Sequence, residues 1–171
     1  INTCSVTNIG ERKSRQMIRR AKKMNPSAVI AVTGCYAQVK TADIKNMPEV
    51  DVVIGTSGRH LICDLVEAVM RGESAEHCAD IMKERAYEEM ECAGETERTR
   101  AYIKIEDGCN NFCSYCIIPY ARGPVRSRRP ENVLAEAARL AKNGFCELVL
   151  TGISISSYGR DLEENIALGD I

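Results

Sequence analysis

The sequence lacks any apolar run close to the roughly 20 residues that a helix needs to cross a bilayer, so no membrane insertion is expected. It also lacks a segment with the pattern of a secretory signal peptide. Internal repeats and low-complexity tracts are absent as well. What remains is a globular protein, whose 171 residues with 44% hydrophobic content can bury a core in one domain or in parts of two.

The cysteine content excludes a second class, the small disulfide-stabilised secreted proteins. Nine cysteines are an odd number, and they are spread along a chain that is not a short secreted scaffold. The pattern therefore favours free thiols in a reducing compartment, and we predict a cytoplasmic location.

Histidine is scarce too, and neither His60 nor His77 lies near the most distinctive group of cysteines. That group is Cys109, Cys113 and Cys116, spaced CxxxCxxC. A structural zinc site needs four closed ligands, and no fourth one stands nearby. A four-iron, four-sulfur cluster held by three thiolates instead leaves one iron open to a small-molecule ligand. We predict such a cluster here and keep zinc, or a purely structural cluster, as the alternative.

Hydrophobic patterns alternate between strands and helices through the first part of the chain. The patterns predict helices over 11–24, 38–47 and 59–71, and strands over 28–33 and 50–54. This alternation is typical of a parallel α/β domain, Rossmann-like or flavodoxin-like, which we place at residues 1–72.

Residues 73–98 carry nine acids against three bases and show poor periodicity, so we predict an acidic linker there. The pattern then predicts a strand over 99–106, a helix over 130–143 and a strand over 146–150. In the first of these strands, apolar Ala101, Ile103 and Ile105 alternate with Tyr102, Lys104 and Glu106, so Glu106 is expected on the face opposite the apolar residues. We interpret residues 99–171 as the start of a second α/β domain, a partial barrel. The three cysteines then lie on the loop at the carboxyl end of a strand, where such folds place reactive groups.

These features resemble the radical S-adenosylmethionine superfamily, in which a CxxxCxxC loop after the first barrel strand holds a cluster with an open iron. The resemblance implies that S-adenosylmethionine binds this iron and is cleaved to a deoxyadenosyl radical. It implies that Tyr115 lines the adenine and that Thr151 and Gly152 form a turn facing the methionine moiety.

Motifs spread over almost the whole chain narrow the resemblance to the methylthiotransferases. They are Asn2-Thr3-Cys4, Gly34-Cys35-Tyr36-Ala37-Gln38, the run from Gly108 to Gly123, Ser127-Arg128, Leu150-Thr151-Gly152 and Tyr158-Gly159. That family carries a second, auxiliary four-iron, four-sulfur cluster on three cysteines of its amino-terminal domain. Cys4 and Cys35 fall on two of these positions, and the third is expected upstream of Ile1. Each of the two follows a predicted strand, so both could lie at one edge of a parallel sheet. Both ends of the chain are thus expected to lie inside domains, as in an internal fragment.

Within the family, the segments 4–8 and 117–128 look most like the branch that acts on N6-threonylcarbamoyladenosine beside the tRNA anticodon. The resemblance implies transfer of a methylthio group to carbon 2 of that base. Two alternatives stay open: transfer to N6-isopentenyladenosine in tRNA, or to an aspartate of a ribosomal protein. The implied partners are the tRNA anticodon loop and an electron donor such as a flavodoxin or a ferredoxin; the sequence carries no signal for an oligomeric state.

Two basic clusters could contact the phosphates of such an RNA, although the net charge is only −1. Residues 12–23 carry seven positive charges, and the sequence does not decide whether this segment touches RNA or is simply a solvated helix face. A second cluster follows the cysteine loop and is predicted to bind RNA: it consists of Arg122, Arg126, Arg128 and Arg129.

Overall fold

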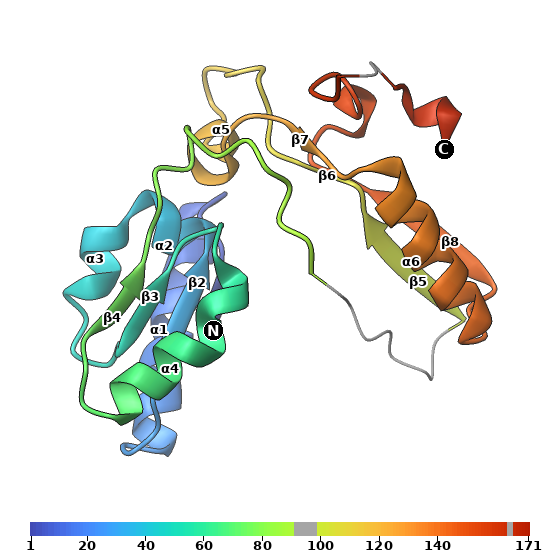
Figure 1. Ribbon diagram of the computed structural model, residues 1–171. Coiled ribbons are helices and arrows are strands. Elements are labelled where there is room, and N and C mark those ends of the chain that lie inside the picture. The colour runs from blue at the N-terminus through green and yellow to red at the C-terminus, as the bar shows by residue number, and fades with distance from the viewer. Residues whose placement is uncertain (91–98, 164–165) are drawn as a thin grey trace. The chain divides into compact units, whose positions relative to one another are not determined.

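The computed structural model of the chain describes residues 1–90, 99–163 and 166–171. These residues divide into two compact units (Figure 1). The first unit contains Ile1–Glu84 together with Asn111–Gly123, and the second contains Arg85–Asn110 together with Pro124–Ile171. Among the described residues, no helix combines the length and the apolar composition needed to cross a bilayer.

The first unit is built on a parallel sheet in the order β1-β2-β3-β4. Its strands are β1 (Asn2–Thr3), β2 (Ala31–Gly34), β3 (Val52–Ile54) and β4 (Ala75–His77). Its helices are α1 (Asn8–Met24), α2 (Cys35–Val39), α3 (Thr41–Lys45), α4 (Ile62–Met70) and α5 (Ile118–Arg122), with a 3₁₀ turn at Arg59–Leu61. In Figure 1, α1 lies behind this sheet and α4 in front of it. The arrangement confirms the predicted parallel α/β fold.

The core of this unit joins α1 to the sheet and to the helices that follow β2. Ile18 of α1, Val32 of β2 and Ile44 of α3 are fully buried in one cluster. The helix α1 begins three residues earlier than its hydrophobic pattern indicated, because the hydroxyl of Thr7 caps it by accepting a hydrogen bond from the Gly10 amide at 3.0 Å.

The second unit contains a parallel pair of strands covered by one helix. The strand β5 (Arg100–Lys104) pairs with β8 (Glu147–Thr151). The short strands β6 (Glu106–Asp107) and β7 (Arg126–Ser127) form an antiparallel pair. The helix α6 (Pro130–Lys142) packs on this unit, and 3₁₀ turns follow at Ile155–Ser157 and Leu168–Asp170. The β5-α6-β8 order is the parallel strand-helix-strand unit expected at the start of a barrel.

Three predictions need correction in detail. The helix predicted over 38–47 is two short helices, α2 and α3, which meet at Lys40. The strand predicted over 99–106 ends at Lys104, and Glu106 does not face outward as strict alternation required: it is fully buried in β6. Part of the predicted linker is a strand, because Ala75–His77 pairs with the edge of β3.

The domain boundaries themselves remain a proposal. The strand β4 extends the first unit's sheet beyond residue 72, since Gly55 donates a backbone hydrogen bond to His77 at 2.8 Å. The segment 111–123, which the sequence predicts within the second domain, groups with the first unit. Residues 91–98 of the predicted linker lie outside the described residues.

Candidate functional site

The cysteine loop connects β6 to α5. Gly108 opens it with a φ of +92°, and Phe112 adopts a φ of +47°. A backbone hydrogen bond of 2.9 Å from the Cys116 amide to the Cys113 carbonyl forms a turn that carries two of the thiols. Cys109 and Cys116 are half-buried and Cys113 is exposed, and all three are free thiols. The division between the two compact units falls inside this loop, after Asn110.

The donor chemistry of this loop fits an iron–sulfur cluster with an open position. From Gly108 to Ile118 its metal-binding side chains are three thiols, with no histidine or carboxylate that could close a fourth position. Among residues 1–90, 99–163 and 166–171, no three Cys, His, Asp or Glu side chains already gather closely enough to hold a metal ion. The loop therefore supplies the ligand set, and it would have to close around a bound cluster.

Aromatic side chains lie on the same loop. The rings of Phe112 and Tyr120 pack edge to face, with centroids 5.8 Å apart and planes at 79°. Tyr115, predicted to line an adenine, is 91% exposed and is thus accessible to a ligand.

Polar groups before the loop fix where it starts. The Asp107 carboxylate accepts a hydrogen bond from the Gly108 amide at 3.0 Å and one from Lys104 at 2.9 Å. The Arg126 guanidinium, also buried, lies 3.9 Å from the same carboxylate. These charged groups lie on β5, β6 and β7, so the short antiparallel pair orients the entry to the cysteines.

Of the predicted pair, Thr151 ends β8 and Gly152 follows it, packing against Glu106. A Cβ atom on Gly152 would lie 2.6 Å from Glu106 Oε2, so a larger residue there would displace the Glu106 carboxylate. The Ser154 amide donates a hydrogen bond of 2.7 Å to the same oxygen. The structure thus brings the Thr151-Gly152 turn beside the strand that leads into the cysteine loop.

Glu106 itself was missed by the sequence analysis. Its side chain is fully buried, and its Oε1 atom has no hydrogen-bond partner among the described residues. Burial raises the pKa of this carboxyl, an effect that the backbone hydrogen bond from Ser154 partly opposes. The signal that could have identified it is the pair Glu106-Asp107, which ends an apolar strand directly before Gly108.

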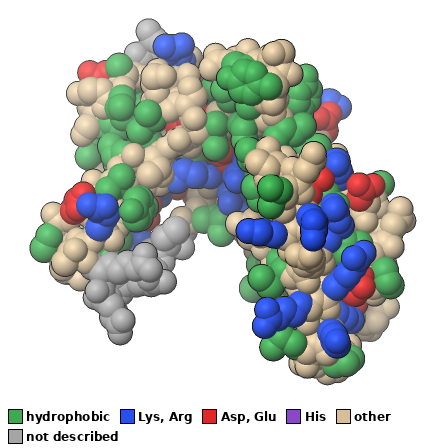
Figure 2. All heavy atoms as spheres, turned by 180° about the vertical axis from the view of Figure 1, so that it is seen from behind, with side chains coloured by type: hydrophobic (Ala, Val, Ile, Leu, Met, Phe, Trp, Pro, Cys, Tyr) green, Lys and Arg blue, Asp and Glu red, His purple; other side chains and the backbone are tan. Residues whose placement is uncertain are grey.

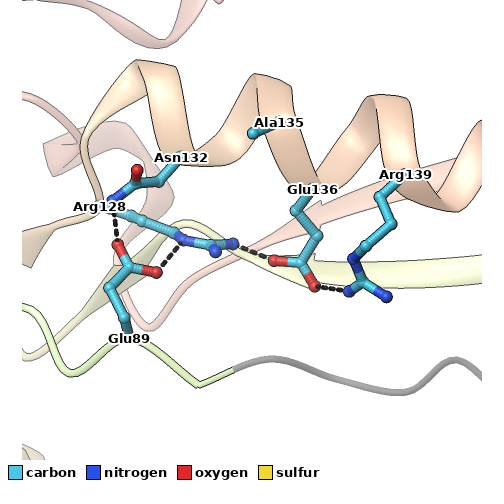
Figure 3. Close-up of a pocket in the computed structure, with 6 residues that line it drawn as sticks. All are labelled: Glu89, Arg128, Asn132, Ala135, Glu136 and Arg139. Atoms are coloured by element: carbon cyan, nitrogen blue, oxygen red, sulfur yellow. Dashed lines mark hydrogen bonds and ion pairs between the residues drawn. The ribbon is translucent and has the colours of Figure 1, made fainter.

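The four arginines predicted to bind RNA are not equivalent. Arg128 is buried, bonding to Glu89 at 2.7 Å and pairing with Glu136 on α6 (Figure 3). These groups line a cavity of about 500 Å³ together with Asn132, Ala135 and Arg139. Arg126 and Arg128 therefore hold the second unit together, whereas Arg129 is exposed.

The structure confirms the placement of Cys4 and Cys35 at one edge of the first sheet. Thr3 of β1 stands opposite Gly34 of β2, and each cysteine follows directly on one of these residues. A Cβ atom on Gly34, whose φ is +100°, would lie 2.4 Å from the Thr3 carbonyl oxygen, so the two strand ends approach closely. Cys4 is exposed and Cys35 is buried.

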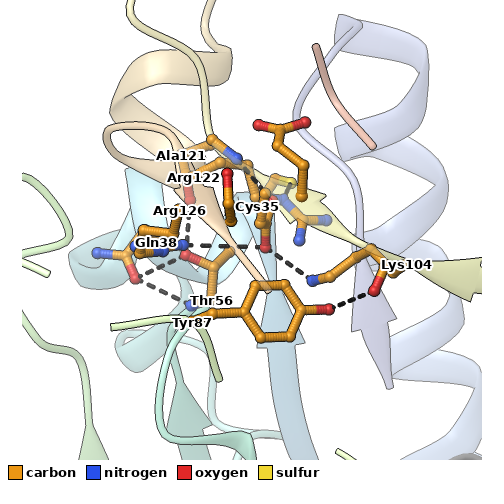
Figure 4. Close-up of polar contacts among 12 residues, drawn as sticks. Cys35, Gln38, Thr56, Tyr87, Lys104, Ala121, Arg122 and Arg126 are labelled. Carbon is orange, nitrogen blue, oxygen red and sulfur yellow. Dashed lines mark hydrogen bonds and ion pairs between the residues drawn. The ribbon is translucent and has the colours of Figure 1, made fainter. Parts of the chain in front are cut away.

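Arg122, the first of the predicted RNA contacts, lies against this edge. Its Nε atom donates a hydrogen bond to Cys35 Sγ at 3.3 Å (Figure 4). The arginine is half-buried at the end of α5, within the first unit.

Comparison with protein families gives two matches. Residues 1–55 match a family described as uncharacterized protein family UPF0004, and residues 103–168 match the radical SAM superfamily. Cys4 and Cys35 lie in the first match, and the cysteine loop and the Thr151-Gly152 turn lie in the second.

Curated relatives cover nearly all of the chain. It is 49% identical, over 96% of its length, to the threonylcarbamoyladenosine tRNA methylthiotransferase MtaB of Bacillus subtilis. The protein of the same name from Aquifex aeolicus is 40% identical over 97% of the chain. The tRNA-2-methylthio-N(6)-dimethylallyladenosine synthase of Clostridium botulinum is 36% identical over 99% of it. The chain spans 37%, 41% and 39%, respectively, of the length of these three relatives.

Proposed function

The chain belongs to the radical S-adenosylmethionine methylthiotransferase family, and from this premise we propose that the whole protein transfers a methylthio group to carbon 2 of N6-threonylcarbamoyladenosine beside the tRNA anticodon. The observation that carries the proposal is the loop of Cys109, Cys113 and Cys116. This loop offers three free thiols and contains no fourth ligand. It follows the carboxyl end of the first strand of a parallel strand-helix-strand unit. The identity of 49% to a relative named for this substrate supports the choice of base.

The three thiols of the loop would hold a four-iron, four-sulfur cluster by one iron each, and its fourth iron would bind S-adenosylmethionine. When bound, this group supplies one-electron reductive cleavage of the cofactor, with the electron coming from a donor such as a flavodoxin or a ferredoxin. The residues around it have positioning roles. Asp107 fixes the start of the loop, Glu106 fixes the Thr151-Gly152 turn, and exposed Tyr115 offers an aromatic face to the adenine.

An auxiliary cluster on Cys4, Cys35 and a third cysteine would hold the sulfur that is transferred. The register that places Cys4 and Cys35 at the ends of neighbouring parallel strands supports this part of the proposal. The free thiols of the described cysteines suit a reducing compartment, so we place the reaction in the cytoplasm.

The first unit carries exposed positive charges that would contact the phosphates of an RNA substrate. Within the described residues, four exposed cations of α1 make no ion pair: Arg12, Lys13, Arg20 and Lys23. Figure 2 shows Lys and Arg side chains gathered over this unit. The target base would have to be presented from a single-stranded loop, because stacking in a duplex hides its edge.

The second candidate is methylthiolation of N6-isopentenyladenosine, which the name of the Clostridium botulinum relative favours. The two functions share their cluster chemistry and differ in the group on the adenine N6. Mass spectrometry of nucleosides from tRNA, isolated from cells with and without the gene, separates them by the mass of the modified base.

The decisive test is Cys113→Ala in the full-length protein, reconstituted anaerobically. We expect the variant to lose both the change in the electron paramagnetic resonance signal on adding S-adenosylmethionine and the methylthiolated nucleoside. The control is Cys63→Ala, an exposed thiol on α4, which should keep both. Intact methylthiolation in Cys113→Ala would refute the proposal. A signal that ignores S-adenosylmethionine in the unmodified protein would favour the structural-cluster alternative.

A further inference from the structure

Arg122 makes an unusual contact for a residue that sequence alone suggests as a phosphate ligand. Its Nε–H points at the sulfur of Cys35, 87 residues away in the chain, at 3.3 Å. Cys35 is 7% exposed and Arg122 is half-buried, so their contact is partly shielded from solvent. A hydrogen bond from a cation to a sulfur in such surroundings is stronger than one exposed to water.

The position of Arg122 is fixed from both sides. The carbonyl of Ala121 accepts a hydrogen bond of 2.6 Å from the Thr56 hydroxyl. Gly123 has a φ of +76°, and a Cβ atom there would lie 2.3 Å from the Ile81 carbonyl oxygen. These contacts restrict the backbone on both sides of Arg122. They therefore fix the direction in which the Arg122 side chain points.

The anchor on Thr56 is itself held by Gln38, three residues after Cys35 on α2. The Gln38 Oε1 atom accepts a hydrogen bond from the Thr56 amide at 2.9 Å, and Gln38 Nε2 donates to the Ala79 carbonyl at 3.0 Å. Figure 4 shows Gln38, Thr56 and Ala121 joined in this way beside Cys35 and Arg122. The helix that carries Cys35 and the helix that carries Arg122 are thus locked together within the first unit.

We propose that Arg122 is a positioning residue for the auxiliary cluster, one whose hydrogen bond to the Cys35 sulfur raises the reduction potential of the metal centre bound there. This inference rests on the proposed function, which assigns Cys35 as a cluster ligand. A ligating thiolate keeps lone pairs that accept an N–H hydrogen bond, so the observed contact is compatible with metal binding. Both the hydrogen bond and the positive charge stabilise the more negative, reduced state of a cluster.

The placement also connects the two halves of the proposed site along the chain. The helix α5 begins two residues after Cys116 and ends at Arg122. One short segment therefore carries a ligand of the first cluster at one end and the hydrogen bond to the second at the other.

The test uses the full-length protein in which Cys109, Cys113 and Cys116 are all changed to Ala, so that iron is bound only at the auxiliary site. In this background the midpoint potential of the cluster is measured by a redox titration followed by electron paramagnetic resonance. We expect Arg122→Leu to shift the potential to a more negative value at unchanged iron content. Arg122→Lys keeps a positive charge but cannot reproduce the Nε–H geometry, so we expect a smaller shift in the same direction.

The matched control is Arg20→Leu, which removes one positive charge from the exposed face of α1 and should leave the potential unchanged. An unchanged potential in an iron-loaded Arg122→Leu protein would overturn the inference and leave the proposed function standing. If the Arg122→Leu protein takes up no iron, the midpoint potential of the iron-loaded Arg122→Lys protein is measured instead, and an unchanged potential there would overturn the inference. If the triple-Ala background itself binds no iron, the auxiliary cluster of the proposed function is refuted, and the role of Arg122 falls with it.

Discussion

At the scale of single residues, the buried carboxyl of Glu106 is the most consequential group outside the cysteines. One of its oxygens holds the turn after β8 through the Ser154 amide, and its close contact with Gly152 fixes that turn sterically. Among the described contacts, no cation pairs with this carboxyl. Burial therefore raises its pKa above the usual 4.5. The residue therefore combines a positioning role with a cost in stability at neutral pH.

This cost has a definite sign. Since the pKa of Glu106 is higher in the folded state, the unfolded state loses its proton first as the pH rises. The stability that the protonated Glu106 carboxyl contributes to the folded state is therefore fully present below about pH 4.5. This stability is lost as the pH rises through the folded-state pKa of Glu106. The variant Glu106→Gln keeps an oxygen acceptor for Ser154 but has no proton to lose.

We expect the unfolding free energy of Glu106→Gln to fall less than that of the unmodified protein between pH 4.5 and neutrality. Urea unfolding at a series of pH values measures this difference. Glu131→Gln, on the exposed first turn of α6, serves as the control and should leave the pH profile unchanged. Parallel profiles for Glu106→Gln and the unmodified protein would show that the carboxyl is not perturbed in this way.

At the scale of elements, the attachment of α5 to the first unit decides where the second half of the cysteine loop lies. Its buried residues Pro119 and Ala121 face that unit, and Gly123 ends the helix against the Ile81 carbonyl. A helix of five residues is too short to be stable by itself, so these contacts are what keep α5 folded.

Replacing Gly123 tests that attachment. We expect Gly123→Ala to lower the unfolding free energy by about 2–3 kcal/mol, because the methyl group meets backbone in addition to the unfavourable positive φ. The control is Gly144→Ala, which has a similar φ of +93° but nothing within 4 Å of the new methyl, and should cost only about 1 kcal/mol. Equal losses in denaturant unfolding would mean that α5 shifts freely and is not fixed by Ile81.

At the scale of the whole molecule, a net charge of −1 conceals a separation of charges that matters for the proposed RNA partner. Four exposed cations without an ion pair among the described residues, Arg12, Lys13, Arg20 and Lys23, lie on α1, whereas Arg126 and Arg128 near the cysteine loop are buried in ion pairs. Since phosphate contacts release counterions, the exposed cations should dominate the salt dependence of binding.

We expect the full-length protein with Arg12→Glu, Arg20→Glu and Lys23→Glu to bind an anticodon stem-loop RNA more weakly and with a shallower salt slope. The slope should fall by about 0.7 for each lost contact to a single-stranded phosphate. The control changes net charge equally at exposed sites elsewhere, through Arg71→Glu, Lys83→Glu and Lys142→Glu. Equal effects of the two triple variants, measured by fluorescence anisotropy at several salt concentrations, would contradict a specific contact by α1.

The sequence by itself determined the parallel α/β fold, the loop of three cysteines and the position of Cys4 and Cys35 at the ends of strands. These features were predictable because they depend on local patterns: apolar periodicity sets each helix and strand, and ligand spacing sets the cluster loop. The same patterns predicted the strand that precedes Gly152, although β8 itself runs one residue further, to Thr151.

Tertiary structure alone decided the partners of the charged residues. Arg122 meets Cys35 across 87 residues, and Arg128 meets Glu89 across 39, so no local pattern could assign them. Glu106 was placed wrongly because a change of strand pairing after Lys104 breaks the alternation on which its outward orientation depended. The segment 111–123 joined the first unit for the same reason: hydrogen bonds and close packing with residues distant in sequence determine its place, and these exist only once the chain has folded.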